Sequence, residues 1–76
     1  MKSFQEISAQ HFKLTPEKIM DSLTPKDVPE WDSMNYLLFI AALEEAYGVS
    51  FTMDEVLTAG SLGELRKFLA AKGAPV

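Results

Sequence analysis

Residues 31–48 read WDSMNYLLFIAALEEAYG, and this stretch decides the fold of the chain. It begins where a proline-punctuated segment ends, and it contains the longest apolar run, Tyr36–Leu43. Asp32 is a good N-cap residue, because its carboxylate can accept a hydrogen bond from a free backbone N–H of the first helical turn. Gly48 can adopt the left-handed conformation that ends a helix. We therefore predict a helix over residues 33–47.

This helix carries two apolar stripes. The first should face the core, because its members follow the i, i+3, i+4, i+7, i+11 spacing of one helical face. Its members are Tyr36, Phe39, Ile40, Leu43 and Tyr47. A surface helix of a small bundle needs only one such stripe, so the second is either further core beneath the preceding loop or an exposed docking surface. The second stripe consists of Met34, Leu37, Leu38 and Ala41.

Ser33 falls at the first position of the predicted helix. Free N–H groups and the positive end of the helix dipole make a helix N-terminus a favourable place for a phosphate group. We interpret Ser33 as a serine that carries a phosphate ester. In the alternative interpretation Ser33 only starts a helix, as Ser3 and Ser61 do, and the chain is a non-catalytic helical interaction module in which Ser33 is unmodified.

Three further helices are predicted, each opened by a capping box, in which Ser or Thr is followed three residues later by Glu. The boxes are Ser3 with Glu6, Thr52 with Glu55 and Ser61 with Glu64. They predict helices over 3–13, over about 54–59 and from 61 to about 72. No segment alternates with period two for long enough to make a strand. The predicted fold class is all-α, a bundle of three main helices and one short helix.

A long connection, residues 14–31, separates the first two helices. Pro16, Pro25 and Pro29 exclude a long helix here, because proline fixes φ and lacks an N–H donor. A structureless loop of this length is unusual in a small domain, so we expect it to be packed down. The apolar residues expected to pin it are Leu14, Ile19, Leu23 and Val28.

The length of 76 residues predicts one domain, 1–76, ordered over about 3–72. The absence of cysteine excludes disulfides and suits a reducing compartment. The chain begins with Met1 and has no signal-peptide pattern, and its longest apolar run is too short to span a membrane. We expect a free-standing cytoplasmic monomer with no membrane contact.

The net charge is −4, and Lys and Arg are absent between Lys26 and Arg66. This distribution argues against nucleic acid as a partner, since such affinity comes from cationic contacts to phosphate. It favours partners with a basic docking patch, although an acidic surface that only aids solubility is the alternative. The acids in this interval are Asp27, Glu30, Asp32, Glu44, Glu45, Asp54, Glu55 and Glu64.

An enzyme is not predicted. His11 is the only histidine and lies beside an apolar stripe, so a structural or surface role is expected. A hydrolase that used Ser33 would need a base nearby, and only His11, on another helix, is available. No metal site is predicted either.

Asp32, Ser33 and Met34 resemble the Asp-Ser-Leu attachment motif of the acyl carrier protein family. The resemblance extends from about Phe4 to Leu69 and includes the long loop before the motif. Further segments that match the family's layout are Ala42–Val49, Phe51 with Asp54 and Glu55, and Ser61–Leu65.

The resemblance implies a four-helix bundle in which a phosphopantetheinyl transferase moves 4′-phosphopantetheine from coenzyme A onto Ser33. The thiol of this group would carry an acyl intermediate as a thioester between partner enzymes. Asp32 would help to hold Mg²⁺ during the transfer. Acyl-loading and acyl-processing enzymes would dock through basic or apolar patches. The predicted docking residues are Met34, Leu37, Leu38, Ala41, Glu44, Glu45, Asp54 and Glu55.

Two departures from the family pattern carry information. Glu30 stands where the family often has glycine, and Trp31 follows it; the indole either packs as a hydrophobic staple against Tyr36 or also lines the path of the arm. Asn35 and Leu38 stand at positions that are acidic and exposed in the family. We therefore expect a more apolar docking face and a specialised pathway, such as polyketide, nonribosomal peptide or single-unit loading. The bulky aromatic core stripe suggests a small or polar cargo.

Overall fold

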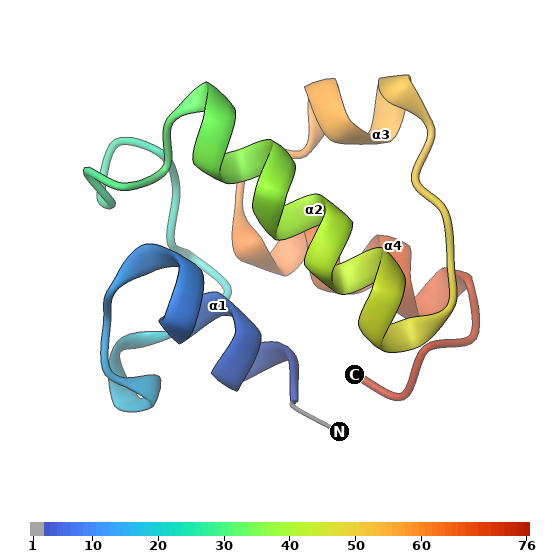
Figure 1. The fold of residues 1–76 in the computed structure, drawn as a ribbon, viewed down its shortest axis with the longest axis horizontal. Helices are drawn as coiled ribbons and strands as arrows, with labels where there is room; N and C mark the ends of the chain where they lie inside the picture. Colours follow the sequence, from blue (N-terminus) through green and yellow to red (C-terminus); the bar gives the residue numbers. More distant parts are fainter. Residues whose placement is uncertain (1–2) are drawn as a thin grey trace.

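The computed structural model describes residues 3–76, which form four α-helices, one 3-10 turn and no strand. In Figure 1, α2 crosses the molecule diagonally, with α1 beside it, α4 behind it and the short α3 at the top. The predicted all-α bundle is confirmed. The elements are α1 (Phe4–Phe12), η1 (Pro16–Lys18), α2 (Ser33–Tyr47), α3 (Met53–Thr58) and α4 (Leu62–Ala71).

Two of the three predicted capping boxes are present, at the starts of α1 and α3. At α4 only one of the two hydrogen bonds of the predicted capping box is present. Ser61 accepts from the Glu64 N–H at 3.3 Å, but the Glu64 carboxylate accepts from the Gly60 N–H at 2.9 Å and not from Ser61. A Cβ on Gly60 would stand 3.0 Å from this carboxylate, so the absence of a side chain there lets Glu64 reach one residue further back.

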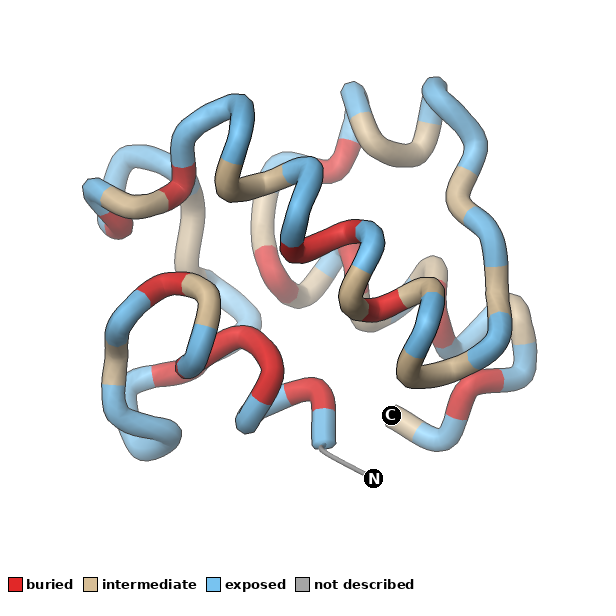
Figure 2. Tube along the Cα trace, in the orientation of Figure 1, coloured by how far each residue is buried: buried red, intermediate tan, exposed pale blue. Residues whose placement is uncertain are grey.

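The core lies where α1, α2 and α4 face one another, as the buried segments in Figure 2 show. Phe39 is fully buried, and its ring centroid lies 4.9 Å from that of Phe12 and 6.2 Å from that of Phe4. Tyr36 and Tyr47, expected in the core stripe, are only half-buried. The side chains of the core with no exposure are Phe12, Phe39, Leu43, Leu62, Leu65 and Leu69.

The long loop is packed down, as predicted: its residues Ile19 and Val28 are buried, and Leu14 and Leu23 are partly buried against the core. Its middle is also fixed to the start of α4, because the Gly63 N–H donates to the Asp21 carbonyl at 2.9 Å. A Cβ on Gly63 would lie only 2.8 Å from that of Asp21, so glycine is needed for this close approach. The loop therefore arrives at α2 as an ordered segment, although it contains only the short turn η1.

The C-terminal segment, residues 73–76, turns back toward the core after α4. Gly73 has φ +90°, and the Ala74 N–H donates back to the Leu69 carbonyl at 3.0 Å. This turn buries Ala74 and lays Val76 against the core. The sequence did not reveal this packing because the tail carries only small apolar residues.

Candidate functional site

Ser33 is exposed at the first position of α2. The predicted cap is confirmed: the Asp32 carboxylate accepts a hydrogen bond from the Asn35 N–H at 2.9 Å. The N–H groups of Ser33 and Met34 have no acceptor within the helix, because the first turn never supplies one. An accessible hydroxyl at the positive end of a 15-residue helix fits a serine that holds a phosphate ester.

The turn before Ser33 is anchored in the core by Trp31. The indole is 8% exposed, stacks on Phe12 with ring centroids 5.0 Å apart, and meets Tyr36 at 5.7 Å. The predicted hydrophobic staple across the Asp32 cap is thus confirmed. Since the indole is buried, it contributes little surface to any path along the outside of the molecule.

Asn35 holds this turn from the other side, which the sequence did not predict. Its Nδ2 donates to the His11 carbonyl at 2.6 Å and to the Glu30 carbonyl at 2.9 Å. Asn35 is half-buried and does not belong to an exposed docking face. The His11 ring packs 5.8 Å from that of Phe39, which supports a structural role for this histidine. Sequence spacing gave no signal for the contact with His11, because the two residues lie 24 positions apart in the chain.

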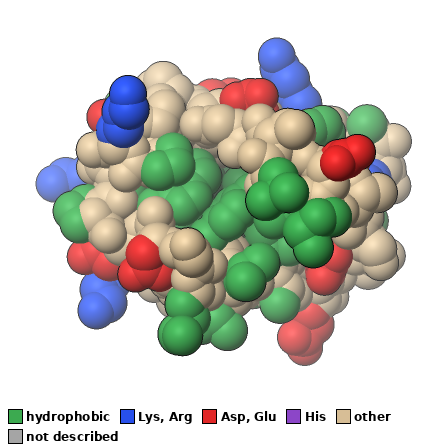
Figure 3. Space-filling model, turned by 90° about the horizontal axis from the view of Figure 1, so that it is seen from above, with side chains coloured by type: hydrophobic (Ala, Val, Ile, Leu, Met, Phe, Trp, Pro, Cys, Tyr) green, Lys and Arg blue, Asp and Glu red, His purple; other side chains and the backbone are tan. Residues whose placement is uncertain are grey.

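The second stripe of α2 lies on the surface and not beneath the loop. Met34 is 74% exposed, and Leu37 and Leu38 are more than half exposed. The helix α3 adds Met53 and Leu57, which sequence reasoning did not include. Figure 3 shows hydrophobic side chains gathered on the side of the molecule where α3 and the start of α2 lie. We call this set the apolar face: Met34, Leu37, Leu38, Ala41, Met53 and Leu57.

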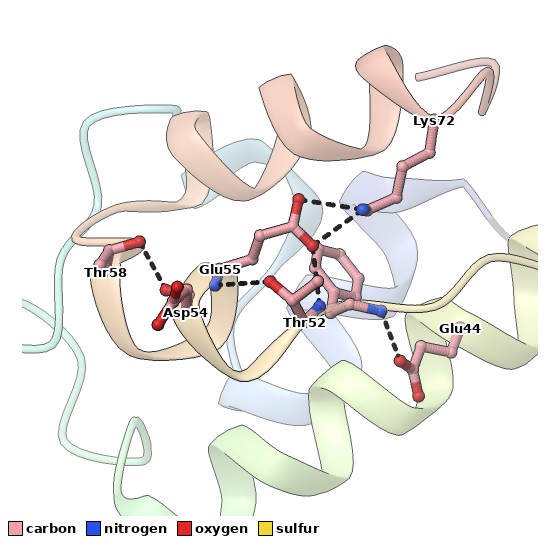
Figure 4. A network of polar contacts seen from close by, with 7 residues as sticks. Glu44, Thr52, Asp54, Glu55, Thr58 and Lys72 are labelled. Carbon is pink, nitrogen blue, oxygen red and sulfur yellow. Dashed lines mark hydrogen bonds and ion pairs between the residues drawn. The ribbon is translucent and has the colours of Figure 1, made fainter.

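The four acids proposed for docking fall into two groups. Glu45 and Asp54 are exposed. The Glu44 carboxylate instead accepts from the Phe51 N–H at 2.8 Å, and the Glu55 carboxylate pairs with the Lys72 ammonium at 2.8 Å (Figure 4). These two acids therefore fix α3 and its approach to the rest of the bundle, and their charges are already engaged within the fold.

The Glu55–Lys72 pair makes stability depend on pH. The hydrogen bond from Lys72, followed by the one from the Thr52 N–H, lowers the pKa of Glu55. A lowered folded-state pKa means that the stabilisation is complete above the ordinary Glu pKa of about 4.3 and is lost as pH falls through the folded value. We expect Glu55→Gln, which keeps an oxygen for Thr52, to melt below the wild type at neutral pH, with the gap narrowing below the ordinary Glu pKa of about 4.3 and closing as pH falls through the lower folded value. Thermal melts across this range measure it, and a constant gap would contradict it.

Within residues 3–76, no cluster of three His, Asp or Glu side chains is arranged to hold a metal ion. None of the helices described has both the length and the apolar character needed to cross a bilayer.

Comparison with known proteins identifies the family. The family described as phosphopantetheine attachment site matches residues 30–69, which is more than half of the chain and spans the Ser33 turn, α2, α3 and most of α4. No curated protein gave a significant match. Members of this family bear covalently attached 4′-phosphopantetheine, and they interact with phosphopantetheinyl transferases and acyl-processing enzymes. The chain belongs to the phosphopantetheine attachment site family of carrier proteins.

Proposed function

We propose that Ser33 bears the 4′-phosphopantetheine and that residues 1–76 form one carrier domain. The observation that carries this proposal is an exposed serine at the first position of α2. It directly follows a turn that is anchored in the core, and it lies within residues 30–69, which the family matches. When bound, the group supplies a terminal thiol that holds an acyl cargo as a thioester. The chain contains no cysteine, so it has no thiol of its own. Its role is that of a carrier and not of a catalyst.

Asp32 has two roles in this proposal. Its carboxylate caps α2, which fixes the residue directly before the attachment point. The same exposed carboxylate helps to hold Mg²⁺ when the transferase acts, since oxygen ligands suit this ion.

Partner enzymes dock on the apolar face, with Glu45 and Asp54 at its charged edge. The first turns of α2 contain no Asp, Glu, Lys or Arg after Ser33 until Glu44, so the partner's matching surface is largely apolar with basic groups at its rim. Such a face suits a dedicated carrier of a specialised pathway, for example polyketide or nonribosomal peptide synthesis. We propose a cytoplasmic monomer with a small or polar cargo, since aromatic side chains fill the bundle.

Intact mass after incubation with coenzyme A, Mg²⁺ and a broad-specificity phosphopantetheinyl transferase tests the site. We expect the wild type to gain one phosphopantetheine and Ser33→Ala to gain none. Ser61→Ala is the matched control, because Ser61 also stands at a helix start and should leave the modification unchanged. A wild type that stays unmodified, while the transferase acts on another carrier, would favour an interaction module in which Ser33 only begins a helix.

A further inference from the structure

One side-chain amide joins three segments of the chain beside Ser33. The Asn35 Nδ2 donates to the carbonyl of His11, in the last turn of α1, and to that of Glu30, at the end of the loop. Asn35 itself lies in the first turn of α2, where its backbone N–H is held by the Asp32 carboxylate. The end of α1, the end of the loop and the start of α2 therefore meet at this residue.

The chemistry of this position requires a donor. The last carbonyls of a helix have no partner within it, so the His11 carbonyl needs a donor from elsewhere. The amide of Asn35 offers two hydrogens, one for each carbonyl that it meets. A carboxylate of the same shape has only acceptors, so it would face the two carbonyl oxygens with no hydrogen to donate to either of them. This explains why an amide, and not an acid, stands at Asn35.

The amide acts on a turn that the core already holds at one point. The Trp31 ring is stacked on Phe12, and the backbone N–H of Trp31 donates to the Val28 carbonyl at 3.0 Å. Asn35 fixes the backbone on one side of Trp31 through Glu30, and on the other side through Asp32. The two residues directly before Ser33 are thus held in place, although they end the long loop.

We propose that Asn35 is a positioning residue for phosphopantetheinyl transfer, an inference that rests on the proposed function of Ser33. In that transfer the Ser33 oxygen forms a bond to phosphorus, the bond to adenosine 3′,5′-bisphosphate breaks, and the hydroxyl proton passes to a base of the transferase. The attacking oxygen must be aligned, and a displacement of about 1 Å can cost about 100-fold in rate. Asn35 limits the conformations that the Ser33 turn can adopt and so raises the fraction of productive complexes.

The test is the steady-state kinetics of transfer to Asn35→Asp and Asn35→Ser, with coenzyme A, Mg²⁺ and the transferase. We expect kcat to fall about tenfold or more, while KM for the carrier stays within about twofold of the wild type, because the apolar face is untouched. Thr24→Val is the matched control. It removes the 3.1 Å bond from the Thr24 hydroxyl to Asp27 in the same loop and should leave kcat unchanged.

Three results would overturn the inference. The first is a wild-type kcat in the folded Asn35 variants. The second is a raised KM with an unchanged kcat, which would make Asn35 a docking contact, and the third is an equal loss of kcat in Thr24→Val. If the variants fail to fold, hydrogen exchange in the wild type still tests the premise: rapid exchange of the Asn35 side-chain amide would mean that its two hydrogen bonds do not persist, and would contradict the inference. No transfer to the wild type at all would instead overturn the proposed function, and this inference with it.

Discussion

Phe39→Ala should lower the free energy of unfolding by about 3–5 kcal/mol, the usual cost of removing a buried phenylalanine ring. Phe39 has no exposed surface, and its ring meets those of Phe4, His11 and Phe12. These three residues belong to α1, so the change removes the main packing between α1 and α2. The cavity adds to the loss, because the surrounding side chains relax only partly. Denaturant unfolding followed by circular dichroism measures it.

The effect is large against the stability of so small a domain, about 4–11 kcal/mol for 76 residues at typical values per residue. Leu38→Ala is the matched control, since Leu38 is the neighbouring residue in α2 but is 56% exposed. It should change the free energy of unfolding by no more than about 0.5 kcal/mol. Equal losses for the two variants would show that Phe39 does not form the centre of the core.

Much of this arrangement could be predicted from local patterns. The caps Ser3, Asp32 and Thr52 mark helix starts because their side chains bond backbone groups only three residues away. Such short-range chemistry can be read directly from spacing. The 3.6-residue period likewise placed Phe39 and Leu38 in different stripes and put Phe39 in the core, although it left open whether the stripe of Leu38 was exposed or lay beneath the loop.

The remaining features depend on contacts between distant segments. Nothing near Asn35 in the sequence indicates that its amide meets the carbonyl of His11, 24 residues away. The sequence predicted Glu44 and Glu55 on a docking face. It could not show that their carboxylates bond within the fold, because an exposed acid and an acid that bonds within the fold have the same pattern in sequence. The pairing of Glu55 with Lys72 depends on the packing of α3 against the end of α4, which joins residues 17 positions apart. The charged residues of a sequence therefore predict the sign of the charge on a surface. They do not show which of these charges already bond to other groups of the fold.

Leu38→Glu should raise KM for the phosphopantetheinyl transferase by about tenfold or more, while the melting temperature stays close to that of the wild type. Leu38 lies on the apolar face and is more than half exposed, so glutamate costs the free protein little. In a complex with an apolar partner surface, however, the carboxylate loses water without gaining a partner. The cost therefore falls on docking and appears in KM rather than in kcat, because the Ser33 turn is unchanged.

Met20→Glu is the matched control, since Met20 is equally exposed, at 55%, but lies in the loop between η1 and α2. It introduces the same charge outside the apolar face and should leave KM unchanged. Glu45→Lys separates the two kinds of docking: a small increase in KM is expected if apolar contacts dominate, because an exposed charge pair contributes at most about 1 kcal/mol. An unchanged KM for Leu38→Glu, together with a large increase for Glu45→Lys, would show that partners are held by charge, and the apolar face would then need another occupant.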